Sequence, residues 1–267
     1  MAALSLNQRL GVLAGISATS IIVLLMVPPI PQDPAYHQFA DRTAVLGIPN
    51  FWNVVSNFPF LLIGLAGLVT CATYTPPGML ADLRPAYLTF FAGVSLVGPG
   101  SAYYHWHPDS TSLFWDRLPM TIAFMAFTAL VVGENVSARL GRRLLWPLLA
   151  GGVASVGYWV LTEAAGHGDL RPYVLVQFLP MLLIPLILLW FPSRLQPDRY
   201  LWMMLLAYGL AKLLEWLDQP LFALCAPVSG HSLKHLAAAL GAYSFLLAVR
   251  RRRPSGGSRL QQLHRQP

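Results

Sequence analysis

The sequence predicts an all-α, polytopic transmembrane helix bundle. The 267 residues are 55% hydrophobic and only 11% charged, whereas about a quarter of the residues in a soluble domain are charged. Apolar runs long enough to cross a bilayer, about 20 residues each, follow one another along the chain. Short connections that contain Gly, Pro or charged residues separate these runs. The sequence therefore leaves no room for a separate soluble domain.

Eight apolar segments are predicted to be membrane-spanning helices. They lie near 10–29, 51–72, 85–105, 114–133, 144–163, 173–191, 201–218 and 231–249. The first belongs to an N-terminal region of residues 1–30, and it is expected to be retained because no small-x-small cleavage pattern follows it. The other seven form a domain of residues 31–249. The remaining residues, 250–267, are polar and rich in arginine, and they are predicted to be a disordered cytoplasmic tail.

Arginine placement predicts the orientation, because an even number of spans puts both chain ends on one side. That side collects most of the basic residues: Arg9, Arg84, Arg139, Arg142, Arg143, Arg194, Arg199 and the tail. The opposite side collects only Arg42, Arg117 and Arg171. By the positive-inside rule both termini are cytoplasmic, and a bacterial inner membrane is the expected location.

The formal net charge of +7 does not predict nucleic-acid binding. Four of the cations form the run Arg250–Arg253, directly after an apolar segment, and no basic stripe alternates with aromatic residues. Such a run is typical of a cytoplasmic membrane flank that also contacts anionic lipid. The sequence predicts membrane lipids as partners and gives no indication of an oligomeric state.

Three histidines lie where apolar helices begin or end. His105 closes the third span, while His231 and His235 open the last one, four residues apart and therefore on one helical face. The predicted topology places all three near the outer face, at the depth of Asp116 in the fourth span. Ionisable groups inside a membrane indicate a functional site. Three imidazoles and an open position are the arrangement of a catalytic zinc ion.

Two further side chains extend this site. Ser101 lies one helical turn before His105 and can stabilise a developing oxyanion, while Asp116 can act as general base and then acid. Simpler interpretations exist for each feature taken alone. A histidine pair at i and i+4 also occurs by chance, Ser101 stands beside Gly98 and Gly100 as in helix packing, and Asp116 suits the first turn of a helix.

The seventh span carries charged residues within an apolar helix. Lys212 and Glu215 are three residues apart and are predicted to pair at depth. Asp218 lies one turn further out, nearer the level of the histidines. Asp218 and Glu215 are candidates for orienting a ligand imidazole. A charge cluster that only locks helices together is an equally compatible interpretation.

The motifs resemble those of the alkaline ceramidases. Ser-x-x-x-His occurs in GSAYYHWHP, an Asp follows eleven positions later in LFWDRLP, and His-x-x-x-His occurs in SGHSLKH. The segment NFWNVVSNFPFLLIG is similar to the first-helix signature of that family, which belongs to a seven-helix membrane hydrolase superfamily with the progestin and adiponectin receptors. The resemblance covers about 33–249. It implies a seven-helix core, to which residues 10–29 add one N-terminal helix.

The resemblance also implies a chemistry. It places a zinc ion among Ser101, His105, Asp116, His231 and His235, where the amide of ceramide is hydrolysed to a fatty acid and a sphingoid base. The implied function is a zinc-dependent intramembrane hydrolase of ceramide or a related long-chain lipid amide. Eukaryotic relatives carry an acidic calcium site that ends in Glu before Phe-Trp-Asn. This chain has Asn50 there, so calcium is not an expected cofactor.

A function from another class stays open at the level of sequence. A lipid-binding receptor or sensor would use the same metal to hold helices together, as structural zinc does. A structural site needs neither a proton acceptor at Asp116 nor a hydroxyl at Ser101. The presence of both residues favours the enzyme.

Overall fold

The computed structural model describes residues 4–255 as a bundle of α-helices, and it confirms the predicted fold class. The helices are α1 Leu6–Met26, α2 Phe51–Val55, α3 Phe58–Thr73, α4 Arg84–Trp106, α5 Ser110–Asn135, α6 Ala138–Ala164, α7 Arg171–Trp190, α8 Arg199–Trp216, α9 Asp218–Cys225 and α10 Gly230–Arg251. Two 3-10 turns, η1 Pro34–His37 and η2 Ala81–Leu83, and two short antiparallel strands, β1 Leu195–Gln196 and β2 Arg253–Pro254, complete the described part.

Each predicted span coincides with a helix, but two spans are interrupted. The second consists of α2 and α3, which are separated by Ser56 and Asn57. The seventh continues from α8 into α9 after a bend of 77°. Six helical segments of the described chain are long and apolar enough to cross a membrane, or up to seven if α8 and α9 count as one span. The protein is therefore an integral membrane protein by composition and architecture.

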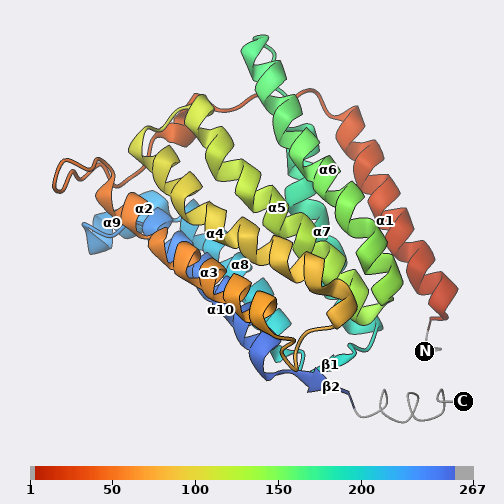
Figure 1. Cartoon of the computed structure of the whole chain (residues 1–267). Helices are drawn as coiled ribbons and strands as arrows, with labels where there is room; N and C mark the ends of the chain where they lie inside the picture. Colours follow the sequence, from red (N-terminus) through yellow and green to blue (C-terminus); the bar gives the residue numbers. More distant parts are fainter. Residues whose placement is uncertain (1–3, 256–267) are drawn as a thin grey trace, which may run out of the picture.

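Helix α4 is not among those six, although the sequence predicts it as a span. It lies between α3 and α5 (Figure 1), so most of its Ser, Gly and Tyr residues are buried against protein, whereas Tyr103 is exposed. Small residues permit close contact on both sides. A Cβ atom at Gly93 would lie 2.8 Å from the backbone nitrogen of Ala123 on α5. Close packing of this kind compensates for the lower hydropathy of α4.

Helix α1 lies at the edge of the bundle, beside α7 (Figure 1). None of its residues is buried, as expected for an apolar helix that is surrounded mainly by lipid. The predicted additional N-terminal helix is thus a peripheral element. The seven other spans pack into the body of the molecule.

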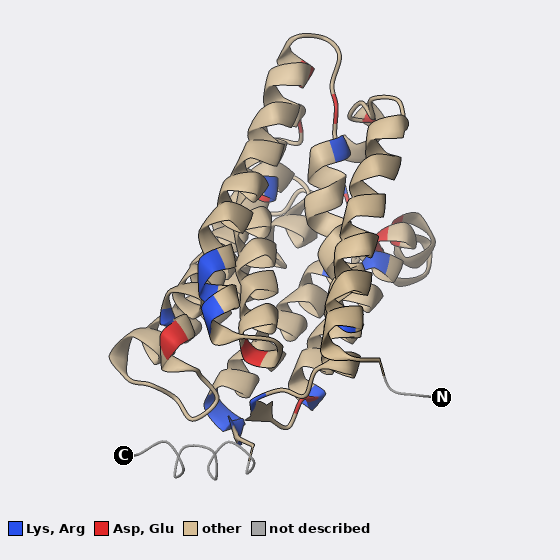
Figure 2. Ribbon diagram, turned by 90° about the vertical axis from the view of Figure 1, so that its right-hand side faces the viewer, with Lys and Arg blue, Asp and Glu red and all other residues tan. Residues whose placement is uncertain are grey.

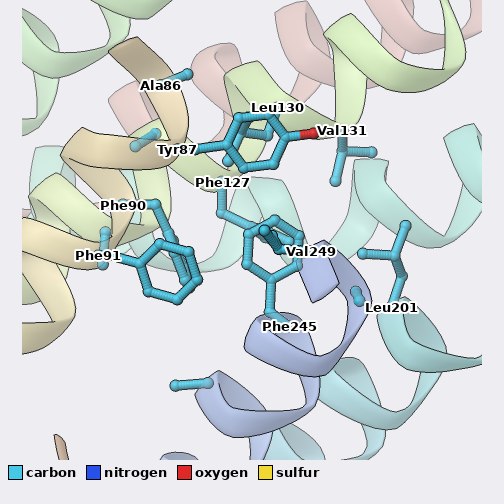
Figure 3. Packing of buried hydrophobic residues seen from close by; sticks show 14 of the residues in the cluster. Ala86, Tyr87, Phe90, Phe91, Phe127, Leu130, Val131, Leu201, Phe245 and Val249 are labelled. Carbon is cyan, nitrogen blue, oxygen red and sulfur yellow. The ribbon is translucent and has the colours of Figure 1, made fainter. Parts of the chain in front are cut away.

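An aromatic cluster fills the half of the bundle nearer the chain ends. Phe90 and Phe91 of α4, Phe127 of α5 and Phe245 of α10 meet there (Figure 3). The ring of Phe245 lies 4.9 Å from that of Phe90 and 5.3 Å from that of Phe127. Edge-to-face contacts at these separations hold the three helices together. A second, smaller hydrophobic cluster, which includes Phe39 and Trp159, lies in the opposite half beside the buried polar side chains.

A buried ion pair closes the same end of the bundle. Arg252 donates two hydrogen bonds to Glu134 of α5, of 2.7 and 2.9 Å, and the Tyr87 hydroxyl donates to the same carboxylate. Both charged side chains are fully buried. Residues 250–254, which were expected to belong to a disordered tail, are instead ordered, because α10 continues to Arg251 and β2 pairs with β1. Residues 256–267 lie outside the described part.

Both ends of the described chain lie at one end of the bundle, and charged residues are sparse along the helices (Figure 2). This arrangement agrees with an even number of crossings. The site built from the first turn of α10 lies at the opposite end, because that helix runs from Gly230 to Arg251 at the terminal end.

Replacing Arg252 should destabilise the protein strongly. Arg252→Ala would leave Glu134 buried without its cation, a change that costs roughly 3–5 kcal/mol. Thermal unfolding of the purified protein in detergent measures the loss. The neighbouring exposed residue provides a matched control, because Arg253→Ala should change stability by less than about 0.5 kcal/mol. Equal losses in the two variants would refute this role of the ion pair.

Candidate metal centre

Three buried imidazoles from two helices lie together at the end of the bundle opposite the chain ends. His105 ends α4 with 1% exposure, while His231 and His235 of α10 are 5% and 4% exposed. One ligand nitrogen from each residue lies within 4.8 Å of the other two. The ring centroids are 4.8–4.9 Å apart. The three histidines that the sequence singles out are thus brought into one cluster.

The start of α10 is fixed by the carboxylate of Asp218 at the start of α9. Its Oδ1 accepts a hydrogen bond of 2.8 Å from the backbone N–H of His231, and its Oδ2 accepts one of 2.9 Å from that of Ala40. Asp218 was expected to orient an imidazole. It contacts His231 through the main chain instead, because the first N–H groups of a helix lack partners within the helix.

His235 is oriented by the break between α2 and α3. Its Nδ1 lies 2.8 Å from the hydroxyl of Ser56 and 3.3 Å from the side-chain amide of Asn57. With Nδ1 engaged, Nε2 remains for the cluster. A second hydrogen bond of this kind is the usual way in which a ligand imidazole is held. The sequence does not assign either residue to the site, since their partner is 178 residues away or more.

An aromatic residue covers the other two imidazoles. The ring of Phe39 lies 4.5 Å from that of His105 and 4.8 Å from that of His231. Phe39 follows η1 in the connection between α1 and α2. We call residues 32–41 of this connection the outer segment. The amide of Asn50 donates a 2.8 Å hydrogen bond to the carbonyl of His105. These contacts exclude solvent from the cluster.

The residues present fit a zinc ion. The Nδ1 atom of His105 is buried and has no hydrogen-bond partner within residues 4–255, which is costly in an apolar setting. Three neutral nitrogen donors are a preferred ligand set of zinc, and three protein ligands leave one position open. The structure itself contains no ion. The chemistry of the donor set supports zinc as the metal.

Ser101 and Asp116 form a pair beside the cluster. Both are buried, and the Ser101 hydroxyl lies near the carboxylate of Asp116. Ser101 lies one turn before His105 on α4, and Asp116 lies on α5.

A cap fixes the start of α5, where the backbone N–H of Ser112 donates to Asp109 at 2.6 Å. This hydrogen bond holds the pKa of the Asp109 carboxyl below its usual value.

Glu215 belongs to a charge cluster rather than to the imidazoles. Its carboxylate pairs with Lys212 at 2.6 Å, which confirms the predicted pair, and also with Lys234 at 2.5 Å. Lys234 lies between two of the histidines on α10, and its Nζ is 3.4 Å from Nε2 of His231. The sequence pattern does not indicate a role for Lys234, because its partner Glu215 lies on a different helix, α8.

Comparison with known families identifies the fold. The ceramidase family model matches residues 45–212 of the chain. This match covers more than half of the sequence.

The chain belongs to the ceramidase family.

In this ceramidase family member the matched region contains Ser101, His105 and Asp116 but ends before α10. The geometry is what adds His231 and His235 to the same site. No curated protein matches the chain.

Metal analysis tests the cluster. The purified protein should carry about one zinc ion per chain, and His105→Ala, His231→Ala and His235→Ala should each lower that content sharply, because two imidazoles remain. His107 is exposed and two residues past His105, so His107→Ala should retain full metal content. Full zinc in all three cluster variants would eliminate the site.

Proposed function

We propose that the protein is a zinc-dependent intramembrane hydrolase that cleaves the amide bond of ceramide or a related long-chain lipid amide. One observation carries this proposal. A cluster of three buried imidazoles occurs together with a buried serine and a buried aspartate, inside a membrane bundle of the ceramidase family. With ceramide as substrate, the products are a fatty acid and a sphingoid-type base.

A cavity of ≈ 260 Å³ inside the bundle supports a lipid substrate. Its polar lining includes Lys234, whose Nζ lies 3.4 Å from Nε2 of His231. The remainder is lined by apolar side chains of six helices, among them Phe60, Phe90 and Met204. An acyl chain fits the apolar part, where its burial supplies most of the binding free energy. The scissile amide then lies at the polar end.

Each polar residue has a role that follows from its position. His105, His231 and His235 hold the metal, and zinc supplies the Lewis acidity that polarises a carbonyl and makes water a nucleophile near neutral pH. Asp116 accepts the proton of the attacking water and delivers it to the leaving nitrogen. The Ser101 hydroxyl orients that carboxylate and donates to the developing oxyanion. Phe39 keeps bulk water out.

Exchange of the aspartate separates an enzyme from a receptor. Asp116→Asn is nearly isosteric but a much poorer base, so it should keep zinc and fold while turnover falls roughly 10²–10⁴-fold. Ser101→Ala should lower turnover on the order of 10²–10³-fold if the hydroxyl is a full oxyanion donor. A ceramide hydrolysis assay measures both effects. Asp82 is exposed and distant from the cluster, so Asp82→Asn serves as the control with unchanged turnover.

Two results would change the assignment. Full turnover by Asp116→Asn would remove the aspartate from the mechanism. A zinc-loaded wild type that binds ceramides and acyl amides without cleaving any of them would identify a metal-stabilised lipid-binding receptor or sensor instead.

The proposed orientation places both termini in the cytoplasm and the histidine cluster near the outer face of a bacterial inner membrane. The arginine distribution supports this orientation, and both described chain ends lie at the end opposite the cluster. Reporter fusions at the C-terminus and after Arg142 should therefore report the cytoplasm. A fusion after His167 should report the outer side. An outward C-terminal reporter would overturn the orientation.

A further inference from the structure

Arg117 of α5 lies inside the bundle, although the arginine count assigns it to the outer flank. Only 5% of its surface is exposed. Its guanidinium carbon lies 4.4 Å from the ring centroid of Trp159, 4.7 Å from that of Tyr173 and 5.6 Å from that of Tyr36. Three aromatic rings therefore surround the cation. Arg117 directly follows the proposed base Asp116 in the sequence.

No carboxylate of the described residues forms a direct ion pair with this cation. Nη2 donates a 2.6 Å hydrogen bond to the neutral side chain of Gln32. Nη1 is buried and has no hydrogen-bond partner among the described residues, and within residues 4–255 no carboxylate lies within 4.0 Å of the guanidinium. Aromatic faces stabilise the charge but accept no hydrogen bond along the N–H edge. A buried charge without a partner is strongly unfavourable.

Arg117 lines the cavity, and the polar end of the cavity has an excess of positive charge. Lys212 and Lys234 line it as well, and both share the single carboxylate of Glu215. The lining of the cavity thus contains three cations and one carboxylate. A neutral amide lipid would add no negative charge to this lining. An anionic group in the cavity would compensate the excess positive charge and would also accept a hydrogen bond from Nη1.

The cavity also adjoins the histidine cluster. Lys234, which lines it, has its Nζ atom 3.4 Å from Nε2 of His231, and Arg117 is the neighbour of Asp116. The other end is apolar and suits the acyl chain. Because the apolar part of the cavity receives the acyl chain, an anion that contacts Arg117 belongs to the amine part of the ligand.

We propose that the substrate is a long-chain lipid amide whose amine part carries a carboxylate, as in an N-acyl amino acid, and that Arg117 binds this carboxylate. The inference rests on the proposed hydrolase function and specifies its substrate class. In the reaction the C–N bond breaks, the acyl carbon gains the hydroxyl of water, and the nitrogen gains the remaining proton. The products are a fatty acid and an amino acid.

A matched pair of substrates tests the charge requirement. N-palmitoylglycine and N-palmitoylethanolamine have the same acyl chain and the same amide. The glycine compound ends in a carboxylate, whereas the ethanolamine compound has a hydroxymethyl group in its place. The full-length zinc-loaded protein in nanodiscs should prefer the glycine compound by about tenfold to a hundredfold in kcat/KM, the value of one buried charged hydrogen bond. Equal use of both amides, or a preference for the neutral one, would overturn the proposal.

Substitutions at the anion site give the residue-level test. Arg117→Gln should abolish the preference, mainly through KM for the glycine compound, whereas Arg117→Lys should keep part of it because the charge remains. Gln32→Glu would place a protein carboxylate beside Nη2 of Arg117. This variant should lower the preference for the glycine compound although Arg117 is retained. It therefore tests the proposal even if Arg117→Gln does not fold. Equal loss of both activities in Arg117→Gln, or an unchanged preference in Gln32→Glu, would contradict the assignment.

A binding measurement separates this proposal from the hydrolase function. The uncleavable sulfonamides N-hexadecylsulfonylglycine and N-hexadecylsulfonylethanolamine should differ in thermal stabilisation of the wild type, the acid being the stronger ligand, and Arg117→Gln should remove the difference. If no amide or ceramide is cleaved yet this difference persists, the hydrolase function fails and the anion site stands. The proposal would be overturned if palmitate stabilised the protein and the two sulfonamides stabilised it equally. Arg117 would then be assigned to the carboxylate of the fatty acid product.

Discussion

The hydrogen bonds from two backbone N–H groups to Asp218 determine the geometry of the candidate centre. One comes from the first turn of α10 and the other from the outer segment. A single carboxylate thus fixes both the helix that carries two imidazoles and the segment that covers them with Phe39. A backbone N–H at a helix start needs an external acceptor, and in a membrane water does not provide it. The polar requirement of the helix end and the positioning of the site are therefore met by the same side chain.

The two ends of the bundle manage buried polarity in different ways. At the end with the chain termini, Arg252 and Tyr87 both donate to the carboxylate of Glu134, which compensates the two charges, although Nε of Arg252 has no partner among the described residues. At the other end Nδ1 of His105 and Nη1 of Arg117 lack a partner among the described residues, and no carboxylate pairs directly with Arg117. A paired charge stabilises the bundle, whereas an unpaired buried group supplies binding free energy to a ligand that completes it. The contrast separates a structural end from a functional end.

The helices could be predicted from the sequence because each apolar run is a local signal. The depth match of His105, His231 and His235 also followed from counting spans and arginines, since helix ends on one side of a membrane share one level. What the pattern did not reveal depends on contacts between distant residues. Ser56 is 179 residues from the imidazole that it orients, and Arg117 looks like a flanking cation until its aromatic neighbours on α6 and α7 are known. Arg252 likewise lies in a run of four arginines, of which it is the buried one.

Helix α10 joins both ends, and this has a consequence for biogenesis. It supplies two of the three imidazoles, and Arg252 follows it directly. When the earlier spans leave the ribosome, Glu134 has no cation and His105 has no companion imidazole. The bundle therefore waits in the bilayer with both polar clusters incomplete until the final span is inserted. Assembly of the centre and closure of the opposite end become a single late event, so a chain that stalls before this point lacks two of the three clustered imidazoles and the cation that pairs with Glu134.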